Sequence, residues 1–304
     1  SVKEGIEIAN KIGFPVVIRP SFVLGGRGME IIYNIKDLKI YLNKVLSFSN
    51  ESILIDQYLT NAIEVDVDAI CDGDTVFLAG IMEHIEEAGI HSGDSACVVP
   101  TQSLSKNILN SIDVQSRKIA LELKVKGLIN IQFAIKEDEI YLLEVNPRAS
   151  RTVPFIAKAT GIPIAKIAAK IMTGKKLNEF NLSINSNNIK YVCVKEAVFP
   201  FARFPGCDIS LGPEMRSTGE VMGIDEDFYK AFAKSQIAAG NNLPLKGHVF
   251  ISINNNDKPQ IIEECKRLKG LGFDIIATSG THDFPSKRGT PSIEVKKILE
   301  GRPN

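Results

Sequence analysis

The sequence predicts an α+β domain with mixed or antiparallel sheets over residues 1–240, followed by an incomplete α/β domain over residues 241–304. Two observations favour the first part: helical segments are interspersed with short strands, and several strand pairs are joined by short turns, as in antiparallel hairpins. Residues 239–246, AGNNLPLK, are a good linker candidate. Beyond them the pattern changes to strand, helix, strand, helix, which is the rhythm of a parallel sheet. Only two strands are predicted there, too few for a closed doubly wound sheet.

The individual elements follow from apolar spacing and from turn residues. Ile6, Ala9 and Ile12 recur at helical spacing before Gly13, a typical helix stop, and Ser105 can cap a long helix. In the first part we expect helices at 2–13, 37–46, 105–125, 153–160 and 164–172, strands at 16–19, 31–33, 53–58, 63–71, 76–83, 128–135 and 140–146, a polar loop at 86–100 and a surface connection at 178–188. In the second part we expect strands at 248–253 and 273–277, a glycine loop after the second strand, and helices at 259–271 and 291–299.

Charge and hydropathy exclude several classes of protein. Lys and Arg total 36, and so do Asp and Glu, so there is no basic excess with which to coat a nucleic acid or an anionic membrane. No apolar run approaches the ~18 residues of a membrane span, and the N-terminus lacks the apolar core of a signal peptide. We therefore expect a cytoplasmic protein with neither membrane nor nucleic acid as partner. Because the chain starts at Ser1 rather than Met, we also expect it to be a piece of a longer polypeptide.

The cysteines do not predict a structural framework. They are odd in number, widely scattered and never spaced as CxxC, so neither disulfides nor a zinc site are indicated. We expect them to be reduced and mostly buried.

The strand pair that ends in LLEVNPRASR carries the strongest candidate site. If the loop between its strands has three residues, Gln132 lies opposite Glu144, and Asn146 lies two residues further on the same face. Carboxylate and amide oxygens would then converge, which suits Mg²⁺ or Mn²⁺. Arg148 and Arg151 follow directly, and guanidinium groups match phosphate and carboxylate oxygens. The alternatives are a polar face that only meets water, and a two-residue loop that breaks this parity.

The glycine-rich segment LGGRGM, residues 24–29, is a second candidate. Glycines let backbone N–H groups approach an oxyanion, and Arg27 adds a positive charge, so this loop could close over a triphosphate. The segment is neither a Walker A motif nor a Rossmann fingerprint, because the spacing of both patterns is absent. A simple turn between two strands is the competing interpretation.

A third candidate is the segment EHIEEAGIHSGD, residues 83–94, which holds two of the four histidines and four carboxylates. Unlike polar groups gathered in one loop suit substrate binding or general acid/base chemistry. A zinc site at His84 and His91 fits no familiar spacing and lacks a thiolate, so we do not favour it.

Five segments taken together resemble one family. They are VVIRPSFVLGGRGMEI, EVDVDAICDG, MEHIEEAGIHSGDSACVVP, NIQFAIKEDEIYLLEVNPRASRTVPF and LGPEMRSTGEVMG. They are similar to the large subunit of carbamoyl phosphate synthetase and, more narrowly, to its second, carbamate-phosphorylating half. The resemblance runs through essentially the whole chain. HSGDSA and EVNPR are specific in combination, whereas an EVNPR-like strand alone would indicate only an ATP-grasp ligase.

The resemblance implies an ATP-grasp fold, in which two α+β lobes clamp ATP, and it implies roles for individual residues. Arg27 would hold ATP phosphate, Gln57 and Leu59 would flank adenine, Glu64 would hold ribose, and Arg148 would hold the phosphoryl group or carbamate. The full implied ATP site comprises Arg27, Gln57, Leu59, Glu64, Gly89, Ile90, His91, Ser92, Gln132 and Glu144. The implied Mg²⁺ or Mn²⁺ ligands are Gln132, Glu144 and Asn146, and a K⁺ site would involve Glu64, His84 and Ser92.

From about Gly240 the chain resembles the start of a methylglyoxal-synthase-like regulatory domain, which we expect to be incomplete. The resemblance implies two effector sites. Ornithine would bind at Glu86, Asp94 and Glu196, and a second effector, such as a nucleotide, would bind at Lys258, Thr278 and Thr281.

The implied reaction is phosphoryl transfer from ATP to carbamate, within glutamine-dependent carbamoyl phosphate synthesis from bicarbonate for arginine and pyrimidine biosynthesis. The implied partners are a glutaminase small subunit and the remainder of the large subunit. Because a lobe preceding Ser1 would supply part of the cleft, we expect little activity from this chain alone. Two alternatives stay open: another ATP-grasp ligase such as a biotin carboxylase or a purine-pathway carboxylase, which the IEEAGIHSGDSA loop disfavours, and a non-catalytic effector-binding module, which the metal cluster disfavours.

Overall fold

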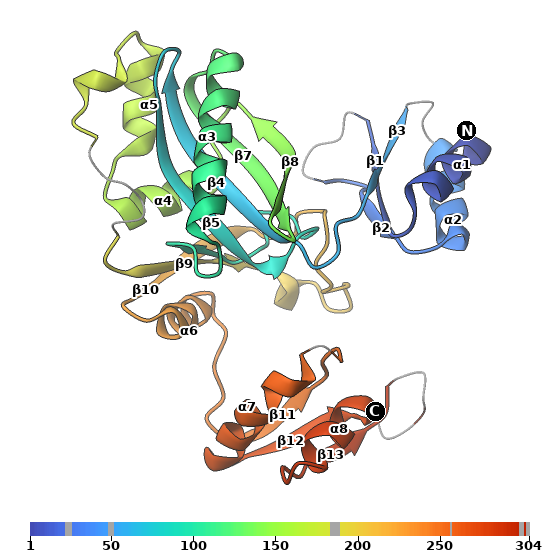
Figure 1. The fold of residues 1–304 in the computed structure, drawn as a ribbon. Helices are drawn as coiled ribbons and strands as arrows, with labels where there is room; N and C mark the ends of the chain where they lie inside the picture. Colours follow the sequence, from blue (N-terminus) through green and yellow to red (C-terminus); the bar gives the residue numbers. More distant parts are fainter. Residues whose placement is uncertain (22–25, 48–51, 183–188, 256, 298–300, 302–304) are drawn as a thin grey trace. The chain divides into compact units, whose positions relative to one another are not determined.

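The computed structural model describes residues 1–21, 26–47, 52–182, 189–255, 257–297 and 301. The chain divides into two compact units, Ser1–Asn241 and Asn242–Asn304. Within the described residues, the first unit holds a three-stranded and a seven-stranded sheet, and the second holds a three-stranded sheet (Figure 1).

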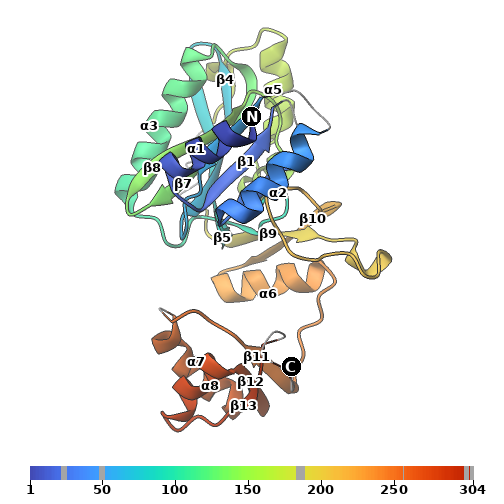
Figure 2. The ribbon, with the colours of Figure 1, turned by 90° about the vertical axis from the view of Figure 1, so that its right-hand side faces the viewer.

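The first unit begins with a small lobe in which two helices cover one face of an antiparallel sheet ordered β2-β1-β3. Its elements are α1 (Val2–Ile12), β1 (Val16–Pro20), β2 (Glu30–Ile32), α2 (Ile35–Leu46) and β3 (Ile53–Gln57). Ser1 and Glu4 form a capping box at α1, and Asn34 caps α2. Apolar side chains such as Ile18 and Leu38 are fully buried between the helices and the sheet. Figure 2 shows α1 and α2 lying over β1.

The seven-stranded sheet is antiparallel throughout and has the order β10-β9-β6-β5-β4-β7-β8. Its strands are β4 (Ile63–Asp72), β5 (Val76–Glu87), β6 (Cys97–Val99), β7 (Lys126–Lys136), β8 (Glu139–Asn146), β9 (Val192–Val198) and β10 (Gly219–Asp225). The sequence did not predict β6, β9 or β10, and β6 lies within the predicted polar loop at 86–100.

Helices pack on both faces of this sheet (Figure 1). They are α3 (Lys106–Glu122), capped by Ser105 as predicted, α4 (Val153–Thr160), α5 (Ile164–Met172) and α6 (Phe228–Ala238), with 3₁₀ turns η1 (Leu177–Glu179) and η3 (Phe201–Arg203). The apolar residues of α3 pack with one face of β4 and β7, and those of α4 and α5 pack with the other face. Helix α6, which was not predicted, lies against β9 and β10, where Gly223 leaves room for its backbone.

One face of the central strand β4 carries buried carboxylates. Its side chains alternate, so Val65 and Val67 enter the apolar core beneath α3, whereas Glu64, Asp66 and Asp68 lie on the opposite face. All three carboxylates are at most 4% exposed. Burial of a carboxylate is costly unless hydrogen bonds or charges compensate it, so this row requires polar partners within the interior.

The hairpin of β7 and β8 departs from the expected loop. Lys136 pairs with Glu139, so the turn has two residues rather than three, and both have positive φ, as a type I′ turn requires. A β-bulge between Gln132 and Phe133 shifts the register by one residue and restores the pairing of Gln132 with Glu144. The predicted pairing is therefore confirmed although the predicted loop length is wrong.

The second unit consists of a parallel sheet ordered β11-β12-β13 with two helices. Its elements are β11 (Gly247–Ile251), α7 (Lys258–Gly270), β12 (Phe273–Thr278), α8 (Ser279–Ser286) and β13 (Ile293–Val295). The predicted helix at 291–299 is wrong, because residues 293–295 pair with β12; residues 298 and 299 lie outside the described part. The predicted glycine loop after β12 is wrong too, since α8 begins there.

Four of the five cysteines, Cys71, Cys97, Cys193 and Cys265, are buried, and all five are free thiols, as predicted. None of the helices in the described segments combines the length and the apolar character that crossing a bilayer would demand.

Candidate nucleotide site

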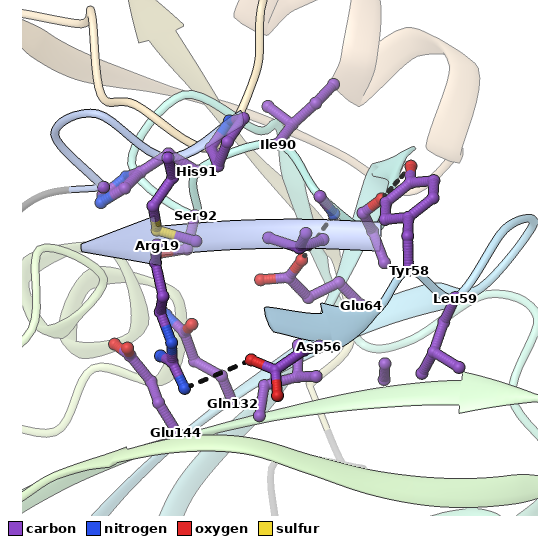
Figure 3. A pocket seen from close by; sticks show the side chains of 18 of the residues that line it. Arg19, Asp56, Tyr58, Leu59, Glu64, Ile90, His91, Ser92, Gln132 and Glu144 are labelled. Carbon is purple, nitrogen blue, oxygen red and sulfur yellow. Dashed lines mark hydrogen bonds and ion pairs between the residues drawn. The ribbon is translucent and has the colours of Figure 1, made fainter. Parts of the chain in front are cut away.

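A cavity of ≈ 980 Å³ lies in the first unit, and both of its sheets line it (Figure 3). The small lobe contributes residues of β1 and β3, and the large sheet contributes residues of β7 and β8. The connection at 88–92 forms a third side, and Pro213 reaches the cavity from the segment between β9 and β10. A volume of this size lies within the range of small-molecule and cofactor sites.

Most of the predicted nucleotide and metal residues meet at this cavity. The lining includes Gln57, Leu59, Glu64, Gly89, Ile90, His91, Ser92, Gln132, Glu144, Asn146 and Arg148. Arg27 is exposed and is not among the described lining residues, although its neighbour Gly26 is. Leu24 and Gly25 of the glycine-rich segment lie outside the described residues.

The oxygen cluster is built on β7 and β8. The Gln132 amide nitrogen donates to the Ser92 hydroxyl at 2.9 Å, and the Asn146 amide nitrogen donates to Glu144 Oε1 at 2.5 Å. Because each amide nitrogen already has a partner, the amide oxygens and Glu144 Oε2 remain as acceptors at the cavity. A set composed of carboxylate and amide oxygens fits a hard divalent cation such as Mg²⁺.

An apolar wall accompanies these polar groups. Val17, Ile31, Leu54, Leu59 and Leu142 all line the cavity. At the same side the Tyr58 hydroxyl donates to the Ala88 carbonyl at 2.8 Å and thereby joins β3 to the 88–92 connection. The cavity thus combines an apolar surface, suited to a flat ring, with a polar cluster.

Glu64 lies at the base of the cavity, where burial raises its pKa to about 6. It accepts a hydrogen bond from the Gly89 N–H at 3.5 Å, and its Oε1 is 3.9 Å from His84 Nδ1. Burial opposes a charged His84 ring, but Cys97, the 3.0 Å hydrogen bond with Asp66 and the charge of Glu64 together raise the pKa of His84 well above its usual value. Of the three predicted K⁺ residues, Glu64 and His84 are therefore neighbours, whereas Ser92 bonds to Gln132.

Hydrogen bonds from two other segments hold the connection that carries His91 and Ser92. The fully buried Lys195 donates to the Ser92 carbonyl at 3.1 Å, and the His91 N–H donates to the Gly212 carbonyl at 2.8 Å. Asp94 accepts from the backbone N–H groups of Arg216 and Ser217 at 2.8 and 2.9 Å. The segment at 207–217 therefore supports the site, a role that the sequence did not reveal.

Arg19 is the principal lining residue that the sequence analysis missed. It lies on β1, its side chain points into the cavity in Figure 3, and its Nη2 is 3.6 Å from the Asp56 carboxylate of β3. A signal was available, because Arg19 is the one charged residue in the otherwise apolar run VVIRP. The sequence pattern placed Arg19 at the end of a predicted strand and did not identify it as a cation at the site.

The predicted effector residues fall into two separate groups, one in each unit. In the first unit, burial and the neighbouring Glu86 raise the pKa of Glu196 to about 7, and Gln236 donates to Glu196 at 2.7 Å. Asp94 is 1% exposed and has both oxygens bonded to backbone. In the second unit, the buried Thr278 and Thr281 hydroxyls are 3.5 Å apart, and Lys258 Nζ lies near Gly280.

Comparison with known proteins relates the whole chain to one family. Residues 1–180 match the family described as carbamoyl-phosphate synthase L chain, ATP binding domain. The carbamoyl phosphate synthase large chain of Archaeoglobus fulgidus is 58% identical over 306 aligned residues, which cover 100% of this chain and 28% of that protein. The C-terminal section of the Aquifex aeolicus large chain is 51% identical, covering 99% of this chain and 59% of that protein. The chain thus spans less than two thirds of either relative.

The fold is also found among solved structures. The biotin carboxylase domain of 2-oxoglutarate carboxylase from Hydrogenobacter thermophilus, solved with MgADP, ADP and bicarbonate, has a TM-score of 0.55 and 20% sequence identity; the match covers 73% of this chain and 55% of that one. At this identity the likeness supports the fold and no more. The chain has an ATP-grasp fold and belongs to the carbamoyl phosphate synthase large-chain family.

Proposed function

We propose that this chain transfers the γ-phosphoryl group of ATP to carbamate, which yields carbamoyl phosphate and ADP. The observation that carries the proposal is the oxygen cluster of Gln132, Glu144 and Asn146 in a cavity that Arg19 and Arg148 also line. Cations and metal ligands at one end of an apolar cavity are the parts that phosphoryl transfer needs, since its catalysis consists mainly of positioning and charge neutralisation.

The residues divide between the two ends of a bound ATP. At the apolar end, Leu59 and Gln57 flank the adenine ring, and Glu64 accepts hydrogen bonds from the ribose hydroxyl groups. At the polar end, Arg19 and Arg148 neutralise the phosphate oxygens. Arg19 takes the phosphate-binding role in this proposal because it lines the cavity, whereas Arg27 is a contributor only if its loop moves toward the nucleotide.

The Gln132, Glu144 and Asn146 oxygens would hold Mg²⁺ or Mn²⁺, which would shield the negative charge of the phosphates when bound. Ser92 fixes the orientation of the Gln132 amide, and Asn146 fixes Glu144, so the chain itself presents acceptors at a defined place. The 88–92 connection closes one side of the cavity and excludes water from the phosphoryl group, which would otherwise be lost to hydrolysis.

The wider setting is also part of the proposal. We propose that the chain acts in the cytoplasm as part of a large chain, with residues 1–240 as the synthetic domain and 241–304 as the start of a methylglyoxal-synthase-like regulatory domain. A glutaminase small subunit and the rest of the large chain would supply carbamate from glutamine and bicarbonate, for arginine and pyrimidine biosynthesis. The K⁺ and effector assignments given above belong to this proposal as well.

The test replaces the matching part of the Archaeoglobus large chain, with which this chain is 58% identical, by this sequence. The chimera should form ATP from MgADP and carbamoyl phosphate. Glu144→Ala should abolish that reaction, while Glu139→Ala, an exposed change at the far end of the same strand, should not. Retained bicarbonate-dependent ATP hydrolysis by the other half, without ATP formation by the chimera, would refute the assignment.

A further inference from the structure

Asp68 is a buried carboxylate outside the cavity that gathers three side chains. It lies on β4 and is 1% exposed. Its Oδ1 accepts from the Ser150 hydroxyl at 2.7 Å and from the Asn130 amide at 3.0 Å, and its Oδ2 accepts from the Thr152 hydroxyl at 2.6 Å. No basic side chain among the described residues pairs with it within 4.0 Å. Burial accordingly raises the pKa of Asp68 to about 6.

Thr152 bonds to Asp68 and does not cap the helix that follows it. Thr152 is the N-cap residue of α4, and a threonine there ordinarily bonds to an N–H of the first turn. Here its side chain caps nothing and donates to Asp68 instead. Ser150 Oγ and Thr152 Oγ1 also lie 2.8 Å apart, so the two hydroxyls and the carboxylate form a compact triangle in which the single proton of each hydroxyl goes to Asp68.

The segment held by this triangle is the short connection at 147–151 between β8 and α4. It is otherwise weakly attached, since residues 147–149 and 151 are exposed. Arg148 Nη1 donates to the neighbouring Ala149 carbonyl at 3.0 Å, and Arg151 Nη1 donates to the Ser217 hydroxyl at 3.5 Å. The connection begins directly after Asn146 of the oxygen cluster, so its position decides where both guanidinium groups lie.

We propose that Asp68 is a positioning residue, which fixes the 147–151 connection through Ser150 and Thr152 so that Arg148, which lines the cavity, is aimed at the group being transferred. The inference rests on the proposed function for the identity of that group. Asp68 does not line the cavity and acts through its two hydroxyl partners. A carboxylate suits this task because it accepts from several donors at once and cannot compete as a donor itself.

The decisive variant is Asp68→Asn, which keeps the shape of the side chain and replaces one acceptor oxygen by a donor. Its matched control is Asp72→Asn at the end of the same strand. Asp72 is 5% exposed and likewise anchors a distant segment, through the Leu177 N–H at 2.8 Å, but it does not line the cavity. Thr152→Val removes one donor, and Thr152→Ser restores it.

Two measurements on the purified chain separate positioning from general stability. Amide hydrogen exchange at residues 148–151, which follow Pro147, should become at least ~10-fold faster in Asp68→Asn and Thr152→Val, and should stay unchanged in Asp72→Asn and Thr152→Ser. Calorimetry should show that the chain saturated with MgADP binds carbamoyl phosphate ~10-fold more weakly in the first two variants. The affinity for MgADP alone, which depends on the other end of the cavity, should change by less than ~3-fold.

The outcomes also separate this inference from the proposed function. The proposed function fails if the Archaeoglobus chimera forms no ATP, while the exchange experiment on the purified chain still decides whether Asp68 anchors the connection. Unchanged amide exchange at 148–151 in Asp68→Asn would overturn the inference. So would an equal loss of carbamoyl phosphate and MgADP affinity, or the same losses in Asp72→Asn.

Discussion

Gln132 of β7 and Glu144 of β8 are cross-strand partners even though the hairpin between them turns in two residues. In an unbroken ladder that starts from the Lys136–Glu139 pair, Leu143 would stand opposite Gln132. The bulge after Gln132 adds one residue to β8 and puts the Glu144 carboxylate there instead. Bulges are common next to active sites because they redirect a side chain in this way.

Gly26 should tolerate no side chain, because a Cβ there would lie 1.8 Å from the Pro213 carbonyl oxygen. Gly26→Ala should therefore separate the glycine-rich segment from the 207–217 segment and weaken MgATP binding by ~10-fold or more. Gly28→Ala is the matched control, since its φ of +71° resembles the +69° of Gly26 but its nearest neighbour is 3.5 Å away. Equal effects of the two changes on affinity, measured by calorimetry, would mean that the Pro213 contact does not matter.

Lys195 should be required for the order of the 88–92 connection. Lys195→Met keeps most of the apolar stem but removes the donor to the Ser92 carbonyl, so the free energy of unfolding should fall by about 1–3 kcal/mol. MgATP affinity should fall as well, because Ser92 orients Gln132. Lys234→Met, which removes the hydrogen bond from α6 to the Ile224 carbonyl of β10 and the ion pair with Asp225, should leave affinity unchanged. Denaturant titration and calorimetry on the same samples would contradict this account if Lys195→Met lost stability alone.

Glu196 should make the stability of the chain depend on pH. Its pKa is raised from 4.5 to about 7 in the folded state by burial and by Glu86. The folded chain therefore keeps a proton that the unfolded chain releases, and this contribution is complete below pH 4.5 and is lost as the pH rises to about 7. Between these pH values, the unfolding free energy should decrease less steeply with rising pH in Glu196→Gln than in the wild type. The two slopes should differ by at most about 1.4 kcal/mol per pH unit.

The measurement for Glu196 is urea unfolding at a series of pH values, with the exposed Glu139→Gln as control. The unfolding free energies of the two variants should diverge between pH 5 and 7, since the carboxyl of Glu196 is buried and that of Glu139 is exposed. Parallel curves for the wild type and Glu196→Gln would contradict a raised pKa at this position.

The parts of the fold that the sequence predicted are those where one periodicity runs uninterrupted. The helices at 153–160 and 164–172 were predicted to the residue because apolar positions recur on one face. Strand β9 was not predicted because the charged residues Lys195 and Glu196 interrupt the apolar pattern of VCVKEAV. Both are buried, and both have polar partners that are distant in the sequence. Pairing over such distances leaves no trace in local spacing.

The same limit explains what was missed at the site and in the second unit. The oxygen cluster could be predicted because its ligands lie on one hairpin, whereas the support of Ser92 by Lys195 joins residues 103 positions apart. In the second unit, Gly280 and Pro285 lie inside α8 and oppose a helix by propensity. Strand β13 is only three residues long and is defined by its pairing with β12.

Metal-dependent nucleotide binding at Glu144 tests the central claim most directly. Calorimetry should show that the chain binds MgATP, that removal of Mg²⁺ with a chelator weakens binding, and that Glu144→Ala loses ~10–100-fold in Mg²⁺-dependent affinity. The matched control Glu139→Ala, on the same strand but at its exposed end, should bind as the wild type does. An unchanged, metal-sensitive affinity in Glu144→Ala would contradict the assignment of the metal cluster and with it the proposed phosphoryl transfer.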